Sequence, residues 1–184
     1  GSNAFFGVVN VITRRGKDLN GVEVSGSAGS FGTYQGRLSA GKLFQNGIEA
    51  MASATAFTSE GQTLYFKEFD DPATRNGYTS GTDGEDAYKL FSKIAYKGLA
   101  LEAFYGYREK GNPTAAFGTI FGSSRNASWD TVASLDLSYS HSFEGLFDLM
   151  TRVYLGQYTY TGQYDYDYST PGNPLIAINR DLVV

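Results

Sequence analysis

The chain has 184 residues, of which 15% are aromatic (14 Tyr, 13 Phe, one Trp), with 23 Gly, four Pro and no Cys. The absence of Cys excludes a disulfide scaffold, a thiolate nucleophile and a zinc–thiolate site, and a formal net charge of −4 leaves no basic surface for nucleic acid. A chain rich in Tyr, Gly, Ser and Thr is typical of many strands joined by tight turns, not of a helical protein.

The first predicted element is a short buried strand. Residues 8–13 are an apolar, β-branched run between Gly7 and Gly16. Residues 17–21 then read as a polar turn. Seven longer segments with period-two alternation follow, and they predict strands at residues 22–30, 34–44, 48–59, 86–97, 99–109, 128–141 and 147–161.

The predicted connections alternate in length. They are short at residues 45–47, 97–98 and 142–146, and long at 60–85, 110–127 and 162–184, with the short turn at 31–33 as the one exception. Strands of roughly ten residues or more that alternate short turns with long loops are typical of bacterial outer-membrane barrels. A soluble β-sandwich, whose tyrosines would edge its core, remains the alternative.

Alternation also predicts two faces. In the barrel interpretation Leu101, Leu135, Leu137, Leu149 and Leu155 face lipid, and Glu102, Asp136, Asp148 and Arg152 face the lumen. Tyrosines toward the strand ends would form interfacial girdles: Tyr88, Tyr96, Tyr105, Tyr107, Tyr139 and Tyr154. No run of about 18 apolar residues is present, so no transmembrane helix is predicted, and a mean hydropathy of −0.28 does not argue against alternating membrane strands.

The first sixteen residues resemble the end of the plug domain of TonB-dependent outer-membrane receptors. In that family a segment Tyr-Gly-x-Asn-Ala-x-x-Gly-Val-(Ile/Val)-Asn-(Ile/Val)-Ile-Thr-(Arg/Lys) is the last plug strand before the barrel. The matching residues here are Gly1, Asn3, Ala4, Gly7, Val8, Asn10, Ile12, Thr13 and Arg14. Residues 83–88 and 113–121 also resemble sequence segments of such receptors.

The resemblance implies an all-β fold, an antiparallel meander of long strands that is part of an outer-membrane barrel of about 22 strands. Residues 1–16 would be the last plug strand, and residues 17–184 the first seven or so barrel strands with long extracellular loops. Seven strands cannot close such a barrel, so two sheet edges would stay unpaired. The absence of a signal peptide and of an energy-coupling box is then interpreted as truncation.

The function implied is active import across the outer membrane of a Gram-negative bacterium. Such receptors bind a scarce ligand, such as a siderophore–iron complex or cobalamin, and use energy delivered through TonB. The expected partners are outer-membrane lipid, the small-molecule ligand and, for the full-length protein, TonB. Two alternatives stay open: a soluble or surface β-sheet binding module, and a small self-contained eight-stranded barrel.

No catalytic, cofactor or metal site is predicted. The one histidine, His141, falls in the lipid-facing register near a strand end and lacks metal-binding partners. Without a nucleophile–base pair, an enzyme is the least favoured class. The acidic loop at residues 60–85 could hold calcium, but it lacks EF-hand spacing and is better explained as a solvated loop.

Ligand contacts are instead expected in the loops, because rigid strands commonly carry functional loops and aromatic side chains often dominate binding energy. The candidate residues are Tyr65, Phe66, Phe69 and Tyr78 in the first long loop, Phe117 and Phe121 in the second, and Tyr164, Tyr166 and Tyr168 in the third. Each of them could equally pack a loop against its neighbour.

Overall fold

The computed structural model describes residues 12–184. The strand predicted at residues 8–13 lies outside the described residues as far as Val11. Residues 12–15 have no regular secondary structure. The predicted polar turn is wrong, because a one-turn helix, α1 (Gly16–Leu19), forms there and ends at Asn20 with a left-handed φ of 40°. The Asp18 carboxylate accepts a hydrogen bond from Arg15 N at 3.2 Å, which satisfies a free amide at the start of the helix.

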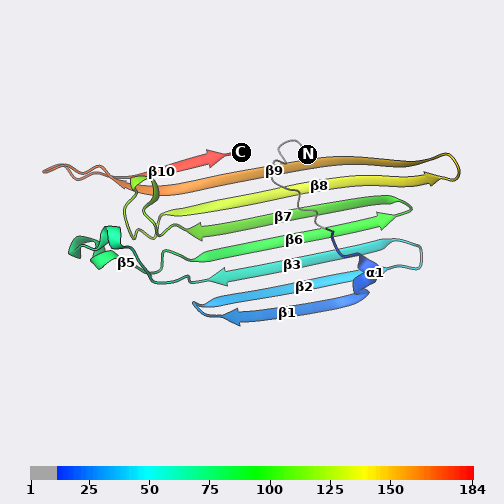
Figure 1. Cartoon of the computed structure of the whole chain (residues 1–184), viewed down its shortest axis with the longest axis horizontal. Coiled ribbons are helices and arrows are strands. Elements are labelled where there is room, and N and C mark those ends of the chain that lie inside the picture. Colours follow the sequence, from blue (N-terminus) through cyan, green and yellow to red (C-terminus); the bar gives the residue numbers. More distant parts are fainter. Residues whose placement is uncertain (1–11) are drawn as a thin grey trace.

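The fold is an all-β, antiparallel meander, as the alternation predicted (Figure 1). Its main sheet has eight strands in the order β1-β2-β3-β6-β7-β8-β9-β10, each antiparallel to its neighbours. The strands are β1 (Gly21–Gly29), β2 (Thr33–Leu43), β3 (Glu49–Ser59), β6 (Glu85–Tyr96), β7 (Leu99–Gly111), β8 (Ala127–Phe143), β9 (Phe147–Asp167) and β10 (Ile176–Val183). A separate two-stranded ladder, β4 (Leu64–Tyr65) with β5 (Tyr78–Thr79), lies in the loop between β3 and β6. The short 3₁₀ helices are η1 (Lys67–Phe69), η2 (Pro72–Gly77) and η3 (Ala116–Gly118).

The prediction fails at the carboxyl end. The expected loop at residues 162–184 contains the last part of strand β9, residues 162–167, and all of β10, so the sheet has eight strands and not seven. The actual connection, residues 168–175, is held by paired backbone bonds between Thr170 and Asn173 (2.9 and 3.0 Å).

The tight turns follow from glycine. Lys97 and Gly98 have φ of 47° and 84°, the two positive values that a two-residue type I′ hairpin requires. Gly47 and Gly145 have φ of 83° and 75° in the other two short turns. Positive φ is readily available to glycine, so these three turns set the register of the strands that they join.

Strand pairing sorts side chains onto two faces. The side that we call the apolar face carries large side chains that are all between 43% and 76% exposed: Val22, Val24, Leu38, Leu90, Ile94, Leu101, Leu135, Leu137, Val153 and Leu155. The opposite side, the polar face, carries Glu23, Arg37, Lys93, Glu102, Asp136 and Arg152, and of these Lys93, Glu102 and Asp136 lie directly opposite one another on β6, β7 and β8. The predicted sidedness of β7, β8 and β9 is therefore present in the pairing.

One tyrosine of the predicted girdles is on the wrong face. Tyr154 pairs with Asp136 on the polar face, because it alternates with Val153 and Leu155. Tyr105 is on the apolar face but in the middle of β7. The remaining tyrosines lie in two rows near the ends of the apolar face, with Tyr96 and Tyr139 in one and Tyr88 and Tyr107, stacked at 6.1 Å, in the other.

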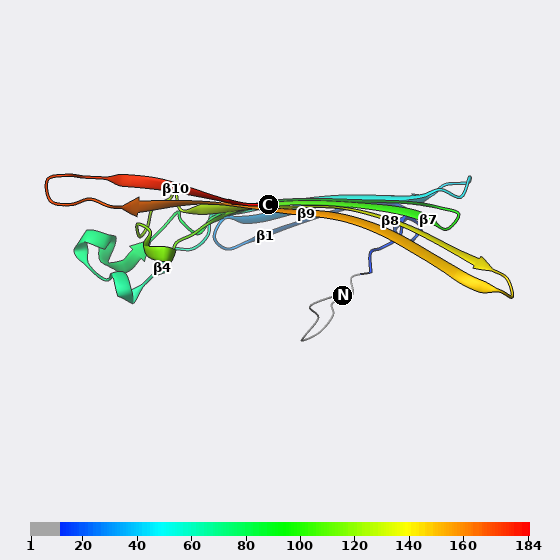
Figure 2. The ribbon, with the colours of Figure 1, turned by 90° about the horizontal axis from the view of Figure 1, so that it is seen from above.

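The sheet is a single layer with almost no enclosed core (Figure 2). Within residues 12–184 the buried hydrophobic residues are Ala87, Ala127 and Tyr164. Helix α1 contacts β2 and β3, where a Cβ on Gly41 would lie only 2.9 Å from the carbonyl oxygen of Gly16. Two glycines thus allow the helix backbone to approach the sheet closely.

Connections separate to the two ends of the sheet (Figure 1). The short turns after β2, β6 and β8 lie at one end, which we call the turn end. The β1–β2 turn and the three longer connections lie at the other, the loop end. The predicted alternation of short and long connections is confirmed, with the third loop shorter than expected.

Candidate functional site

The nine predicted ligand contacts gather at the loop end but do not form one site. Phe66 and Phe69 come from the first loop and Phe121 from the second, and Phe121 stacks on Phe69 at 4.2 Å and meets Phe66 edge-on at 5.7 Å. All three rings are half-buried. This cluster joins two loops that are distant in sequence, so its rings mainly pack the loops together.

The exposed candidates lie around this cluster. Tyr65 and Tyr78 pair across β4 and β5 with ring centroids 5.0 Å apart. Phe117 is 81% exposed and has a φ of 59°, a backbone conformation that costs free energy in a residue with a side chain. Tyr168 is exposed and stacks on Tyr166 at 5.8 Å. These rings are the accessible aromatic surface of the three loops.

Tyr164 and Tyr166 are strand residues and not loop residues as predicted, because β9 continues to Asp167. Tyr164 is buried, contacts Phe117 edge-on at 6.0 Å and shares a short hydroxyl–hydroxyl contact with Tyr160. Burial and that hydrogen bond raise the pKa of the Tyr164 phenol above its ordinary value. It is therefore neutral at physiological pH and can both donate and accept a hydrogen bond.

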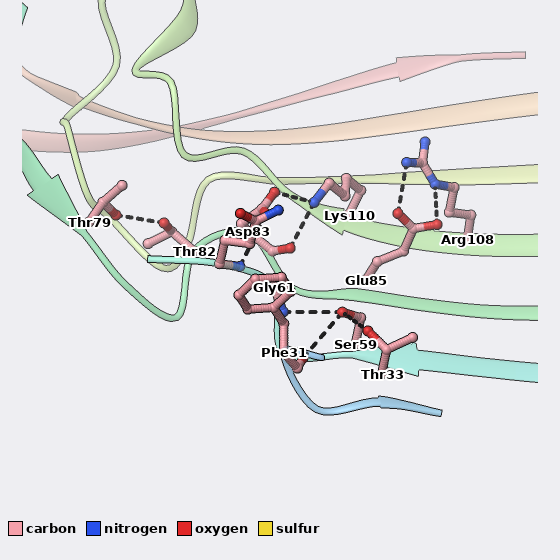
Figure 3. Close-up of polar contacts among 11 residues, drawn as sticks. Phe31, Thr33, Ser59, Gly61, Thr79, Thr82, Asp83, Glu85, Arg108 and Lys110 are labelled. Atoms are coloured by element: carbon pink, nitrogen blue, oxygen red, sulfur yellow. Dashed lines mark hydrogen bonds and ion pairs between the residues drawn. The ribbon is translucent and has the colours of Figure 1, made fainter. Parts of the chain in front are cut away.

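Polar contacts anchor the first loop to the strands (Figure 3). Lys110 donates to the carboxylate of Asp83 and, at 2.7 Å, to its backbone carbonyl. Partial burial raises the pKa of Asp83, but the bonds from Lys110 and from Gln62 N outweigh it and the net shift is downward. Next to this pair, Arg108 forms two bonds of 2.9 and 3.0 Å with Glu85. These ion pairs thus hold together the start of β6 and the end of β7 at the loop end.

Asp165 anchors the second loop, and sequence reasoning missed it. Its carboxylate Oδ2 accepts from Ser123 Oγ at 2.6 Å and from Arg125 Nε at 2.7 Å. Its backbone amide donates to Asn126 Oδ1 at 2.8 Å, and its carbonyl accepts from Ile120 N at 2.8 Å. Asp165 is fully buried. The predicted loop position gave no signal for this role, which depends on β9 being longer than expected.

The polar face contains a network of ion pairs across strands. Lys93 Nζ lies 2.6 Å from Glu102 Oε1, Arg152 Nε lies 2.6 Å from Asp136 Oδ2, and Arg37 lies 2.8 Å from Glu23. The segment preceding α1 joins this network, since Lys93 also donates to Thr13 Oγ1 at 3.3 Å. The face is hydrophilic but close to electrically neutral.

His141 lies on the apolar face at the turn end, as predicted. Its ring is 4.5 Å from that of Phe143 and 6.2 Å from that of Tyr139. No group of three His, Asp or Glu side chains suited to a metal ion is found in residues 12–184.

None of the helices that the structure describes is long and apolar enough to span a membrane. No protein-family model matches the chain. No solved structure matches it either.

Proposed function

We propose that this chain is part of the barrel wall of a TonB-dependent outer-membrane receptor. The whole protein would be a barrel of about 22 strands in the outer membrane of a Gram-negative bacterium, without enzymatic activity. It would import a scarce ligand, of the siderophore–iron or cobalamin class, with energy delivered through TonB. The ligand class and the energy source are carried over from the resemblance of residues 1–14.

The observation that carries the proposal is the apolar face. Soluble monomers rarely expose a large contiguous apolar patch, whereas here Leu, Ile and Val side chains of six strands stay exposed on one side. Tyr88 and Tyr96 bound this face on β6 and are eight residues apart, about 27 Å along a strand. Outer-membrane barrels have an apolar band about 25 Å tall between aromatic girdles. A lipid bilayer is the environment that fits such a surface.

The open edges favour a larger barrel over an eight-stranded one. Strands β1 and β10 each lack a second partner among the described residues. Eight strands could close, but the interior of such a barrel is just wide enough for side chains. Residues 12–19 already contact the polar face through Thr13, Lys17 and Gly16. A helical turn on that face needs a wider interior, which further strands would provide.

Cysteine labelling tests the proposal, since the chain has no native Cys. Leu137 and Asp136 are neighbours on opposite faces of β8. In the full-length protein in native membranes, Asp136→Cys should react with a water-soluble maleimide and Leu137→Cys should react only after denaturation. Equal reactivity would contradict the membrane assignment. A monodisperse, detergent-free monomer with both positions labelled would favour a soluble binding module.

A further inference from the structure

Strand β3 places four alanines in succession on the apolar face. Because side chains alternate along a strand, these residues point to the same side: Ala50, Ala52, Ala54 and Ala56. The neighbouring strands β2 and β6 carry larger side chains beside them: Leu38, Lys42, Tyr88, Leu90 and Ile94. The alanines are therefore the floor of a shallow groove between β2 and β6, which we call the alanine groove.

The alanine groove is continuous along β3. It consists of three adjoining hollows, of which neighbouring ones share Ala52 or Ala54, and it runs from Lys42 toward the turn end to Tyr88 toward the loop end. The floor over residues 50–56 extends about 20 Å along the strand. One leaflet accounts for about 15 Å, half of the hydrocarbon core of a bilayer. The groove is therefore long enough to hold an extended acyl chain from a single leaflet.

Two lysines lie at the turn end of the groove. Lys42 Nζ is 5.7 Å from the centre of the Phe44 ring, two residues nearer the turn, so the Lys42 stem runs toward the turn end. Lys97 Nζ is 5.1 Å from the centre of the Tyr96 ring. A Cβ on Gly47 would lie 3.8 Å from that ring, so the β2–β3 turn meets the same tyrosine. Neither ammonium is paired with a carboxylate in the described part of the chain.

The loop end of the apolar face carries the opposite charge. Asp86 and Glu109 lie opposite each other there on β6 and β7, and Tyr107 donates to Glu109 at 3.3 Å. A negatively charged group is thus attracted to the turn end of this face and repelled from its loop end. A headgroup with a net negative charge also suits two ammonium groups better than a zwitterionic one, whose own cation they repel.

We propose that the alanine groove binds one anionic phospholipid. Its acyl chain lies along residues 50–56, and its headgroup phosphate lies between Lys42 and Lys97. The rings of Phe44 and Tyr96 hold the two ammonium groups at the level of the headgroup. The inference rests on the proposed function, because short turns face the periplasm in an outer-membrane barrel, so the lipid belongs to the periplasmic leaflet. It assigns a headgroup charge, a leaflet and a place on the sheet to this lipid.

The test is photolabelling of the full-length protein in lipid vesicles. The probes are phosphatidylglycerol and phosphatidylcholine, each with a diazirine on an acyl chain, and mass spectrometry of peptides maps the label. We expect phosphatidylglycerol to label residues 48–59 about tenfold more than phosphatidylcholine does, with about fivefold contributed by each lysine. Residues 147–154 of β9, which lie outside the groove, should be labelled alike by both probes. Millimolar inorganic phosphate should not compete, because the acyl chain is part of what is bound.

Matched variants separate the charge from the groove. Lys42→Gln and Lys97→Gln should each reduce the preference for phosphatidylglycerol about fivefold, whereas Lys42→Arg keeps the charge and should retain it. Lys89→Gln removes a lysine from the polar face of β6 and should change nothing. Ala54→Leu fills the floor and should reduce the labelling of residues 48–59 by both probes. Ala28→Leu, the same change on the apolar face of β1, is its control.

The outcomes distinguish this inference from the proposed function. If the two probes label residues 48–59 and 147–154 alike, bulk lipid covers the apolar face, the specific site is wrong and the barrel assignment stands. Protection of residues 48–59 alone would mean that another copy or another protein covers the groove. Competition by lipopolysaccharide but not by phosphatidylglycerol, or by inorganic phosphate, would likewise overturn the phospholipid site. If neither segment is labelled, the apolar face does not meet lipid and both proposals fail.

Discussion

The two faces of the sheet are built from alternate residues of the same strands, yet only one of them has its partners within the described chain. On the polar face Lys93 meets Glu102 and Arg152 meets Asp136 across neighbouring strands. On the apolar face Leu101, Leu137 and Val153 lie in one row and stay 43–56% exposed. The comparison teaches that the polar face is satisfied locally, while the apolar face needs a partner that the described residues do not supply.

The difference between the faces is tested most strongly at the middle of the apolar band. Leu135 lies in the row of Ala103 and Leu155, midway between the tyrosine rows. If lipid covers this row, Leu135→Arg should destabilise the full-length protein by about 2–4 kcal/mol, the cost of Arg at a bilayer midplane. Urea titration of protein folded into lipid vesicles measures this change.

The matched control is Ser134→Arg, one residue earlier and on the polar face between Phe104 and Gly156. Its guanidinium can stay hydrated, so we expect a change below about 1 kcal/mol. Equal destabilisation by both substitutions would remove the distinction between the faces.

The second prediction tests whether the polar contacts of a buried residue, Asp165, hold the second loop in place. Asp165→Asn weakens the bonds from Ser123 and Arg125 at a fully buried position. The expected loss of stability is about 1–3 kcal/mol, because a buried charge-assisted bond is replaced by an imperfect neutral one. Amide hydrogen exchange of residues 112–126 should accelerate.

Asp167→Asn is the comparison for Asp165. Asp167 is exposed and accepts from Ser169 N at 2.9 Å. Its replacement should leave exchange in residues 112–126 unchanged. If the two variants behave alike, the loop is held by its aromatic cluster and not by Asp165.

The third prediction concerns the coupling energy of an ion pair on the polar face. The side chains of Lys93 and Glu102 are only 21% and 32% exposed, so their coupling should exceed that of a surface pair. A double-mutant cycle with Lys93→Met and Glu102→Gln should give about 1 kcal/mol. The Arg15–Asp18 pair, at 54% and 44% exposure, should give less than about 0.5 kcal/mol in the same cycle. Equal couplings would mean that the strand-crossing network adds no stability of its own.

Much of the fold was predictable because alternation and turn chemistry are local properties. Asn46–Gly47 and Lys97–Gly98 mark hairpins through the positive φ that glycine allows, and the first six long strands agree with the structure to within two residues at each end. Strand β10 was missed, because residues 162–184 were predicted to form a loop. The pairing that makes it a strand depends on residues 160–167 of β9, a long-range contact that periodicity does not encode.

The site was less predictable than the fold. The sequence identified aromatic residues at the loop end, but it could not distinguish Phe121, which packs two loops together, from Phe117, which is exposed. Burial depends on contacts between loops distant in sequence. Tyr154 was misplaced for a different reason: it was assigned to a girdle by its residue type, although its alternation with Val153 and Leu155 places it on the polar face.

The smallest expected effect is a change in the mobility of the first long loop, residues 60–85, at low pH. Asp83 has a pKa below its ordinary value of 3.8, because the bonds from Lys110 and Gln62 N outweigh the effect of partial burial. A carboxylate whose pKa is lowered by folding contributes stability above its unfolded pKa, and that contribution disappears as the pH falls through the lowered value. Amide exchange in residues 60–85, corrected for its intrinsic pH dependence, should therefore be slow at pH 6 and faster near pH 3. Asp83→Asn cannot ionise, so this loop should be looser at pH 6 and gain little further mobility in acid. If the variant keeps the native pH dependence, another group at the loop end controls the opening and the Asp83–Lys110 pair does not.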